Sequence, residues 1–172
     1  MERAQALAFE RSCSDETGRL LHVLAAQRGR ARVGEIGTGV GVGAAWIASV
    51  LAPGVPLVTV ELDPERAAAA RELFADDPDV RVLEGDWHEL MPPEAPFDLL
   101  FYDGGGKQHP EVDGEQVLGL LAPGATLLMD DLTPGRVGPD PVREFWLTRR
   151  DLVAVELQVT RRECVIVAVR TV

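Results

Sequence analysis

The feature that most constrains the fold is the glycine-rich stretch at residues 32–43, Arg-Val-Gly-Glu-Ile-Gly-Thr-Gly-Val-Gly-Val-Gly. A short apolar run leads into it, and residues 44–51 have a helix-forming composition. Glycine adopts positive φ angles and lets the backbone approach a ligand that a Cβ atom would push away. The following helix offers unpaired N–H groups and the positive end of its dipole. The stretch therefore predicts the strand, turn and helix with which an α/β sheet binds a nucleotide-like ligand.

The glycines alone leave the ligand open. Gly39-x-Gly41-x-x-Ala44 also fits a dinucleotide fingerprint, and Glu61 lies twenty residues after Gly41, where a ribose-binding acid is expected. A tight turn with no ligand is the remaining interpretation. The choice among these depends on the rest of the chain.

Composition and charge narrow the class of protein. The 172 residues, 46% hydrophobic and 26% charged, fit a single domain over 1–172 with a sizeable core. The net charge of −11 argues against a nucleic-acid partner, which needs a basic face. Cys13 and Cys164 form no disulfide framework. No apolar run approaches the roughly 20 residues of a membrane span, and the N-terminus has no signal-peptide pattern, so we expect no membrane partner and a cytoplasmic location.

Strands and helices alternate along the chain, which predicts a doubly wound, mostly parallel α/β sheet. Residues 1–31 are expected to be helical, with Ser14 as an N-cap, and Asp63-Pro64 is expected to begin another helix. Two apolar strands separated by Arg161-Arg162 predict a C-terminal antiparallel hairpin. The expected strands are 33–36, 57–62, 80–83, 97–102, 125–129, 152–160 and 163–169. The helix that Asp63-Pro64 begins continues over 67–74, and the later helices are 112–121 and 142–148.

Nearly every expected strand ends in a carboxylate, and ligands of such sheets lie beyond the carboxyl ends of the strands. Glu61 can accept two hydrogen bonds from a ribose diol, since Asp63 is the better placed helix cap. Asp86 can accept from an adenine amino group or cap the next helix. Trp87 can cover the adenine ring or pack in the core.

Three further acids, Asp103, Asp130 and Asp131, follow two strands that we expect to be neighbours, about 4.8 Å apart. Carboxylates brought together repel one another unless they are protonated or neutralised by a cation. Oxygen ligands suit a hard ion such as Mg²⁺. The three acids therefore predict a divalent cation site, unless Asp130 or Asp131 caps a turn before Thr133-Pro134.

Four segments together resemble class I S-adenosylmethionine-dependent methyltransferases, and more narrowly the cation-dependent O-methyltransferases of the catechol and caffeoyl-CoA type. The segments are Glu35-Ile-Gly-Thr-Gly-Val-Gly, Val60-Glu-Leu-Asp-Pro-Glu65, Phe97-Asp-Leu-Leu-Phe-Tyr-Asp103 and Leu121-Ala-Pro-Gly-Ala-Thr-Leu-Leu-Met-Asp-Asp131. Residues 14–21 resemble that family's entry segment, and residues 140–145 resemble its last helix. The resemblance covers nearly the whole chain.

The resemblance implies a Rossmann-like, seven-stranded sheet completed by the hairpin, and S-adenosylmethionine as the cofactor. The implied cofactor-binding residues are Glu35, Gly37, Thr38, Gly39 and Gly41 near the methionine part, Glu61 at the ribose, and Asp86 and Trp87 at the adenine. Leu62, Gly85 and Asp103 are also expected to bind the cofactor. Asp103, Asp130 and Asp131 match the family's Mg²⁺ ligands. The metal then positions vicinal hydroxyls and lowers the pKa of the one that is methylated. The transfer itself is an in-line displacement at the sulfonium methyl.

This chain departs from the family in several places, among them Asp131, where the family usually has an asparagine. The family usually has a lysine three residues after Asp103, whereas here Lys107 comes fourth. Lys107 and His109 are the candidate bases, together with Asp103 as a catalytic residue. Gly43 falls where the family often has a serine that contacts the cofactor. Because little of the chain is left to build a lid, the acceptor site is either open or completed by the second subunit of a homodimer.

The leading hypothesis is an S-adenosylmethionine-dependent O-methyltransferase acting on a hydroxyl of a small, catechol-like aromatic molecule with Mg²⁺ or another divalent cation. The first alternative is an NAD-dependent oxidoreductase, for which the chain lacks a recognisable catalytic Ser-Tyr-Lys or His-Asp set. The second alternative is a non-catalytic module that binds S-adenosylmethionine.

Overall fold

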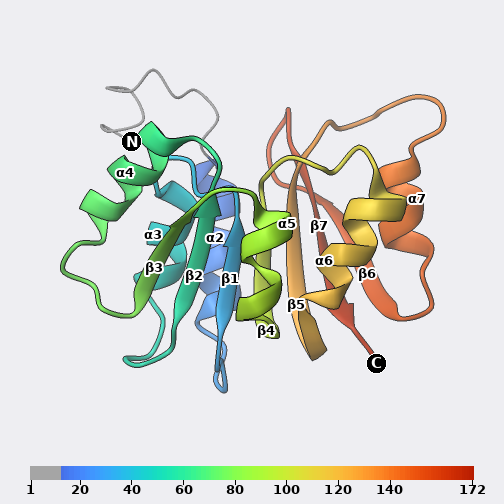
Figure 1. The fold of residues 1–172 in the computed structure, drawn as a ribbon. Helices are drawn as coiled ribbons and strands as arrows, with labels where there is room; N and C mark the ends of the chain where they lie inside the picture. The colour runs from blue at the N-terminus through green and yellow to red at the C-terminus, as the bar shows by residue number, and fades with distance from the viewer. Residues whose placement is uncertain (1–12) are drawn as a thin grey trace.

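The computed structural model describes residues 13–172, and the part of the helical prediction that falls on residues 1–12 lies outside them. Strands and helices alternate as predicted (Figure 1). The elements are α2 (Asp15–Ala25), β1 (Val33–Ile36), α3 (Val42–Ala48), β2 (Leu57–Glu61), α4 (Pro64–Leu73), β3 (Val80–Glu84), α5 (Trp87–Leu90), η1 (Pro92–Glu94), β4 (Phe97–Tyr102), η2 (Pro110–Gly114), α6 (Glu115–Gly119), β5 (Leu121–Leu132), α7 (Pro141–Thr148), β6 (Leu152–Gln158) and β7 (Cys164–Arg170).

The seven strands form one sheet in the order β3-β2-β1-β4-β5-β7-β6. The first five are parallel, and β7 runs antiparallel to both β5 and β6. This confirms the doubly wound sheet and its antiparallel C-terminal hairpin. Ile36 pairs with both Val60 and Tyr102, and Tyr102 pairs with Met129. The residues that follow these positions therefore leave the sheet at the same level.

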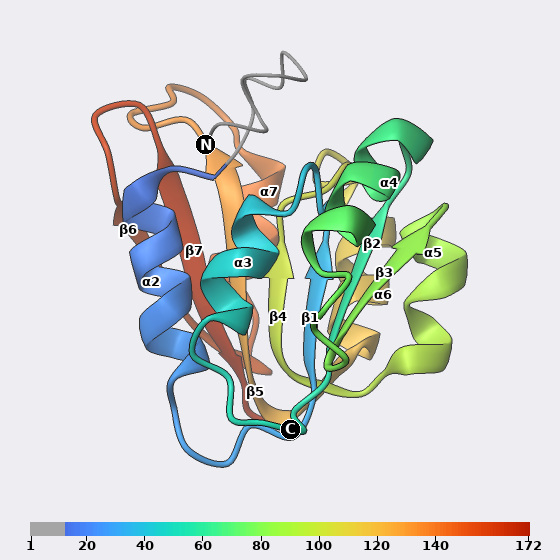
Figure 2. The ribbon, with the colours of Figure 1, turned by 90° about the vertical axis from the view of Figure 1, so that its left-hand side faces the viewer.

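Helices cover both faces of the sheet. α2 and α3 pack together on one face, and α5 and α6 lie on the other (Figure 2). Adjacent residues of a strand point to opposite faces, so Leu100 and Leu127 join the core under α5, α6 and α7, while Leu99 and Leu128 join the core under α2 and α3. Strands buried on both faces explain the nearly continuous apolar runs in the sequence.

The connection between β3 and β4 is short. It contains the four-residue α5 and the three-residue turn η1.

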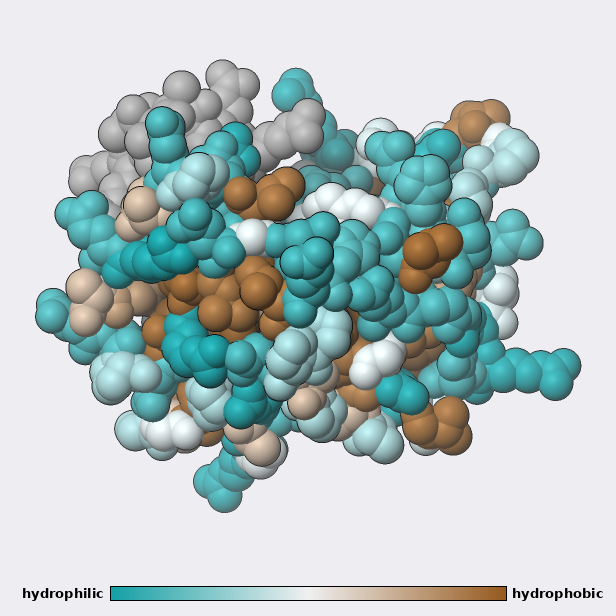
Figure 3. All heavy atoms as spheres, viewed as in Figure 1, coloured by the Kyte–Doolittle hydropathy of each residue, from teal (hydrophilic) through white to brown (hydrophobic). Residues whose placement is uncertain are grey.

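Figure 3 shows apolar surface over β2 and β3, beside α5, bordered by polar groups. No helix in the described part of the chain has the length and the apolar character that crossing a membrane requires.

Local capping rules place most helix starts correctly. Ser14 accepts a hydrogen bond from the amide of Thr17, and Asp63 accepts from the amides of Glu65 and Arg66. The helix expected at 112–121 is different: a π-helical turn at Pro110–Gly114 precedes the short α6. Leu121 already pairs with Phe97, so the chain enters β5 before the Pro-Gly pair that was expected to separate helix and strand.

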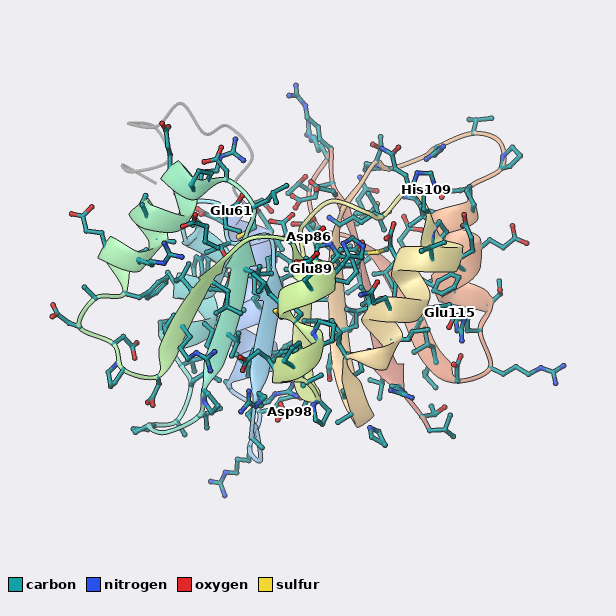
Figure 4. The ribbon with its side chains drawn as sticks, in the orientation of Figure 1. Glu61, Asp86, Glu89, Asp98, His109 and Glu115 are labelled. Atoms are coloured by element: carbon teal, nitrogen blue, oxygen red, sulfur yellow. The ribbon has the colours of Figure 1, made fainter. Side chains whose placement is uncertain are left out.

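The edge of the sheet at the amino ends of the parallel strands is held by Asp98, which lies at the lower edge in Figure 4. Its Oδ2 atom accepts hydrogen bonds from the amides of Ala31 and Arg32 at 2.5 and 2.8 Å. Arg30 donates to the backbone carbonyl of Asp98 at 2.7 Å. The carboxylate therefore fastens the loop between α2 and β1 to the start of β4.

Replacing Asp98 by alanine is expected to lower the free energy of unfolding by about 1–3 kcal/mol, because two amide donors lose a charged acceptor. Urea unfolding measures the difference. Asp76→Ala is the control, since Asp76 is an exposed acid whose loss should change stability by less than about 0.5 kcal/mol. Equal stability of the two variants would show that Asp98 does not fasten this loop.

Candidate functional site

A cavity of about 960 Å³ lies beyond the carboxyl ends of the parallel strands. Its walls come from the segments that follow β1, β2, β3, β4 and β5, and from the start of α7. Figure 4 shows Glu61, Asp86 and His109 along this upper edge of the sheet. The predicted site residues that line it are Gly37, Thr38, Gly39, Glu61, Leu62, Gly85, Asp86, Trp87, Asp103, Lys107, His109 and Asp131. Ligand sites of open α/β sheets lie at this edge and have volumes of this order.

The glycine loop approaches the loop after β4 at backbone distance. A Cβ atom on Gly37 would lie 2.7 Å from the backbone nitrogen of Gly104, and Gly37 has φ +93°. A Cβ atom on Gly104 would lie 2.7 Å from Ile36 Cγ2. Both positions therefore require glycine, and the two loops form one continuous wall of the cavity.

Glu61 lies where the sequence predicted, at the end of β2 and on the cavity. Its Oε2 atom accepts a hydrogen bond from the amide of Gly39 at 2.7 Å, and Oε1 accepts from the amide of Asp63 at 3.0 Å. A carboxylate has about four lone-pair positions, so these bonds leave acceptor capacity for a ligand. The next residue, Leu62, is 73% exposed and lines the same cavity.

Glu35 has a different role from the predicted cofactor contact. It is 1% exposed and is not part of the cavity wall. Its Oε2 atom accepts a hydrogen bond from the hydroxyl of Thr59, which in turn is hydrogen-bonded to the hydroxyl of Thr38 in the glycine loop. Burial raises the pKa of Glu35 to about 8, although the bond from Thr59 opposes this shift. Glu35 therefore stabilises the glycine loop through the hydroxyl groups of Thr59 and Thr38.

Two of the glycines serve packing. Gly43 lies over Glu35, because a Cβ atom there would fall within van der Waals overlap of Glu35 Oε1. This explains why a serine is absent at this position. Gly41, predicted to bind the cofactor, lies outside the cavity wall. It has φ +92° at the start of α3, and a Cβ atom would lie 2.9 Å from Leu73 Cδ2.

Asp86 both caps α5 and binds a histidine that sequence reasoning missed. Its Oδ1 atom accepts from the amide of His88 at 2.9 Å and contacts His88 Nδ1 at 2.7 Å. Nε2 of His88 lies 2.7 Å from Asp113 Oδ1. Burial alone would lower the pKa of His88, but the bonds to Asp113 and Asp86 outweigh it and raise the pKa. The sequence signal for this contact was that His88 follows the helix-capping residue Asp86 by two positions.

Trp87 packs in the core, which is one of the two interpretations that the sequence left open, and its contact with the adenine stays a prediction. It is 7% exposed and belongs to the core, and it also lines the cavity. Its ring stacks on His88 with the centroids 3.8 Å apart and meets Tyr102 edge-on at 5.9 Å. The indole therefore forms an apolar wall between the core and the cavity.

The acids after β4 and β5 do not form the predicted metal cage. Lys107 Nζ lies between two of them, 3.1 Å from Asp131 Oδ2 and 3.8 Å from Asp103 Oδ1. Asp130 is 2% exposed and is not part of the cavity wall. Within residues 13–172, no group of three or more His, Cys, Asp or Glu side chains is arranged to hold a metal ion. The residues present therefore do not fit a divalent cation.

Burial raises the pKa of Asp103 to about 8, against the opposing effect of the Lys107 ammonium group. Burial and a hydrogen bond to Glu163 also raise the pKa of Asp130. His109 is exposed at the start of η2, where it lines the cavity. Its role as a base stays a prediction.

A family model described as a methyltransferase domain matches residues 35–132. The match is more than half of the 172 residues and runs from the glycine stretch to the acids after β5. The chain belongs to this family of methyltransferase domains. The predicted resemblance to class I S-adenosylmethionine-dependent methyltransferases and the Rossmann-like fold are thereby confirmed.

Individual relatives are similar over a large part of the chain. A Mycobacterium tuberculosis protein named "Probable O-methyltransferase" is 30% identical over 133 residues, covering 74% of this chain and 59% of that protein. A protein-L-isoaspartate O-methyltransferase of Methanopyrus kandleri is 34% identical over 122 residues, covering 69% and 50%. The chain thus matches only about half to three fifths of the length of these curated relatives.

The fold is also found in solved structures. The O-methyltransferase TomG from Streptomyces achromogenes, crystallised in complex with SAM, superposes with a TM-score of 0.80 at 27% identity. The superposition covers 98% of this chain and 86% of that chain.

The buried carboxyl of Glu35 makes stability depend on pH. Its pKa rises from an ordinary value of 4.5 to about 8 on folding. Between these pH values Glu35 holds a proton in the folded state and has lost it in the unfolded state. The contribution of this group to the free energy of unfolding is therefore fully present below about pH 4.5 and is lost as the pH rises to about 8. Glu35→Gln is neutral at every pH. From pH 5 to pH 9 its free energy of unfolding is expected to rise by roughly 2–4 kcal/mol relative to that of the wild type.

Chemical denaturation of both proteins across this pH range measures the difference. Comparing the two curves removes the contribution of the other titrating groups, which both proteins share. Parallel curves would mean that Glu35 titrates normally in the folded protein.

Proposed function

We propose that the protein is an S-adenosylmethionine-dependent O-methyltransferase that methylates a hydroxyl of a small aromatic acceptor. The observation that carries the proposal is the position of Glu61, a carboxylate at the cavity whose oxygens bind the glycine loop and keep acceptor capacity. A ribose diol donates two hydrogen bonds, and a carboxylate is the side chain that accepts both. Family membership supports the same cofactor.

The residues fit S-adenosylmethionine along the length of the cavity. Leu62 is a large apolar side chain left 73% exposed beside Glu61, and a bound purine would cover it. Trp87 offers an apolar wall on the same cavity. We assign the adenine to Leu62, Gly85, Asp86 and Trp87, the ribose to Glu61, and the methionine part to Gly37, Thr38, Gly39 and Asp103.

The acceptor is assigned to the other end of the cavity. Lys107 and Asp131 provide charge there, and Leu132 and Val142 provide apolar surface on the cavity wall. A planar ring with a hydroxyl group suits this combination of apolar and charged groups. The cavity extends to Thr133 and Arg143, which bound this end.

Bound S-adenosylmethionine supplies a methyl group on a positively charged sulfonium. The acceptor hydroxyl gives its proton to the carboxylate of Asp103. The methyl group of S-adenosylmethionine, held by Glu61 and the glycine loop, would then be transferred to that oxygen, with the sulfur as the leaving group. The protein contributes chiefly by positioning the two reactants and by stabilising charge on the acceptor oxygen.

Membership of the methyltransferase-domain family disfavours the NAD-dependent oxidoreductase. The non-catalytic binding module is the alternative that turnover experiments separate from this proposal. The homodimer, the cytoplasmic location and the absence of a nucleic-acid partner stay predictions. Size-exclusion chromatography of the purified protein tests the first of these.

Replacing Glu61 by alanine is expected to weaken the binding of S-adenosylhomocysteine by about 1–3 kcal/mol, because the ribose loses a charged acceptor. Isothermal titration calorimetry measures the affinity. Glu84→Ala is the matched control, since Glu84 pairs with Glu61 in the sheet but is not part of the cavity wall. Binding of NAD⁺ in place of S-adenosylhomocysteine, or an unchanged affinity in Glu61→Ala, would contradict the assignment.

Methyl transfer from labelled S-adenosylmethionine is expected to give a methyl ether on a catechol or another hydroxylated aromatic compound, detected by mass spectrometry. A peptide containing L-isoaspartate tests the chemistry named for the Methanopyrus kandleri relative. If a methyl ester formed only on that peptide, the acceptor would be a carboxyl group of a peptide and not the hydroxyl of an aromatic compound. Cofactor binding without turnover on a broad panel would favour the non-catalytic module.

A further inference from the structure

Lys107 is the only lysine among the 17 basic residues of the chain, the others being arginine. Its Nζ atom donates to Asp131 Oδ2 at 3.1 Å, lies 3.8 Å from Asp103 Oδ1 and stands 5.5 Å from the centre of the Tyr102 ring. The side chain is only 11% exposed although it comes from a loop. A compact ammonium group is therefore held inside the acceptor end of the cavity.

We propose that the Lys107 ammonium group is the resident cation of the acceptor site, that it takes the place of a divalent metal ion, and that it binds the acceptor oxygen. This inference rests on the proposed methyltransferase function. It concerns how that function is carried out in this chain.

The ammonium group lies between Asp103 and Asp131, where a metal ion bound to both carboxylates would lie. A magnesium ion bound to both carboxylates would lie about 2.0–2.1 Å from their oxygens, in the space that Nζ now occupies. A divalent ion beside the ammonium group would also be repelled by it. Lys107 already neutralises part of the negative charge that would attract a metal.

The third predicted ligand is engaged elsewhere. Asp130 Oδ1 accepts a hydrogen bond from the amide of Asp131 at 2.7 Å. Asp130 also interacts with Glu163, whose Oε1 atom accepts from the hydroxyl of Thr17 at 2.9 Å. Asp130 is thus part of a buried network that joins β5 to the β6–β7 hairpin and to α2. Its carboxylate positions Asp131 through the backbone.

Residues on both sides of the ion pair have positive φ angles. Asp131 has φ +67° and is the only non-glycine residue with a positive φ among residues 13–172. Gly106, directly before Lys107, has φ +98°, and a Cβ atom there would lie 3.1 Å from Asp113 and from the Tyr102 hydroxyl. Unusual backbone conformations of this kind persist where the surrounding structure requires them, often at functional sites.

An ammonium group has three N–H donors. One binds Asp131 and a second faces Asp103, which leaves a third for the acceptor oxygen. As the acceptor hydroxyl gives its proton to Asp103, the ammonium group stabilises the negative charge that develops on oxygen until the bond to the methyl carbon forms. A divalent ion performs the same task in metal-assisted catalysis.

The test compares the wild type with Lys107→Met, which removes the charge but keeps the length of the side chain, and with Lys107→Arg, which keeps the charge. Turnover by the wild type is expected to be unchanged in excess EDTA. Lys107→Met is expected to lose about 100-fold in kcat, the usual effect of removing one donor to a developing oxyanion, and Lys107→Arg is expected to lose less. Loss of wild-type turnover in EDTA and its return with Mg²⁺ would overturn the proposal.

A second measurement does not require activity. Electron paramagnetic resonance follows the binding of Mn²⁺, and we expect Lys107→Met to bind Mn²⁺ at least tenfold more tightly than the wild type, because two facing carboxylates lose their cation. The control is the double variant Lys107→Met/Asp131→Asn, which lacks one of the two carboxylates. It is expected to bind Mn²⁺ no more tightly than the wild type. Equal Mn²⁺ binding by the wild type and Lys107→Met would overturn the proposal.

Selective ¹³C labelling of lysine gives one side-chain signal, since the chain has one lysine. Mn²⁺ bound at this site in the wild type would broaden that signal, and such broadening would contradict the proposal. If no acceptor is ever methylated, the proposed function fails, while the Mn²⁺ measurements still decide whether Lys107 occupies the cation site.

Discussion

The close approach of two backbones, at Gly37 and Gly104, determines the form of the site. Neither residue has space for a Cβ atom, so the loops after β1 and β4 meet without side chains between them. The parallel register places both loops at the same level of the sheet, because Ile36 pairs with Tyr102. Glu61 then reaches the first loop and Lys107 follows the second. In the proposed function, the cofactor and the acceptor bind at the two ends of this one cavity.

Buried polar groups stabilise this arrangement from inside the sheet. Glu35 reaches the glycine loop through Thr59 and Thr38, and Asp130 holds the amide of Asp131. Neither carboxylate is part of the cavity wall. A buried carboxyl needs hydrogen-bond partners, and its removal leaves those partners unpaired. The acids that follow the strands thus divide into those that line the cavity and those that form hydrogen bonds beneath its loops.

The sequence predicted the strands, the hairpin and the caps at Ser14 and Asp63 because these follow from local patterns of apolar and capping residues. It also predicted most of the cavity wall, since residues that end parallel strands lie at one edge. It did not predict the roles of Glu35 and Asp130 or the contacts of Lys107. Those depend on the direction in which a side chain points and on partners far away in the chain, as His88 and Asp113 illustrate.

The two ends of the parallel strands have different roles, since the carboxyl ends border the cavity and the amino ends are held by ion pairs and hydrogen bonds. At the amino ends of the strands, Asp98 binds the loop before β1, and Glu94 pairs with Arg32 and Arg81. Asp98 lies at the lower edge in Figure 4, opposite the labelled Glu61 and Asp86, and Arg32 directly precedes β1. Sequence change at that edge can therefore adjust the temperature range of the protein without altering ligand recognition, and the opposite edge can acquire new specificity while the scaffold keeps its strength. Such independence lets one architecture adapt to heat and to new substrates by separate routes.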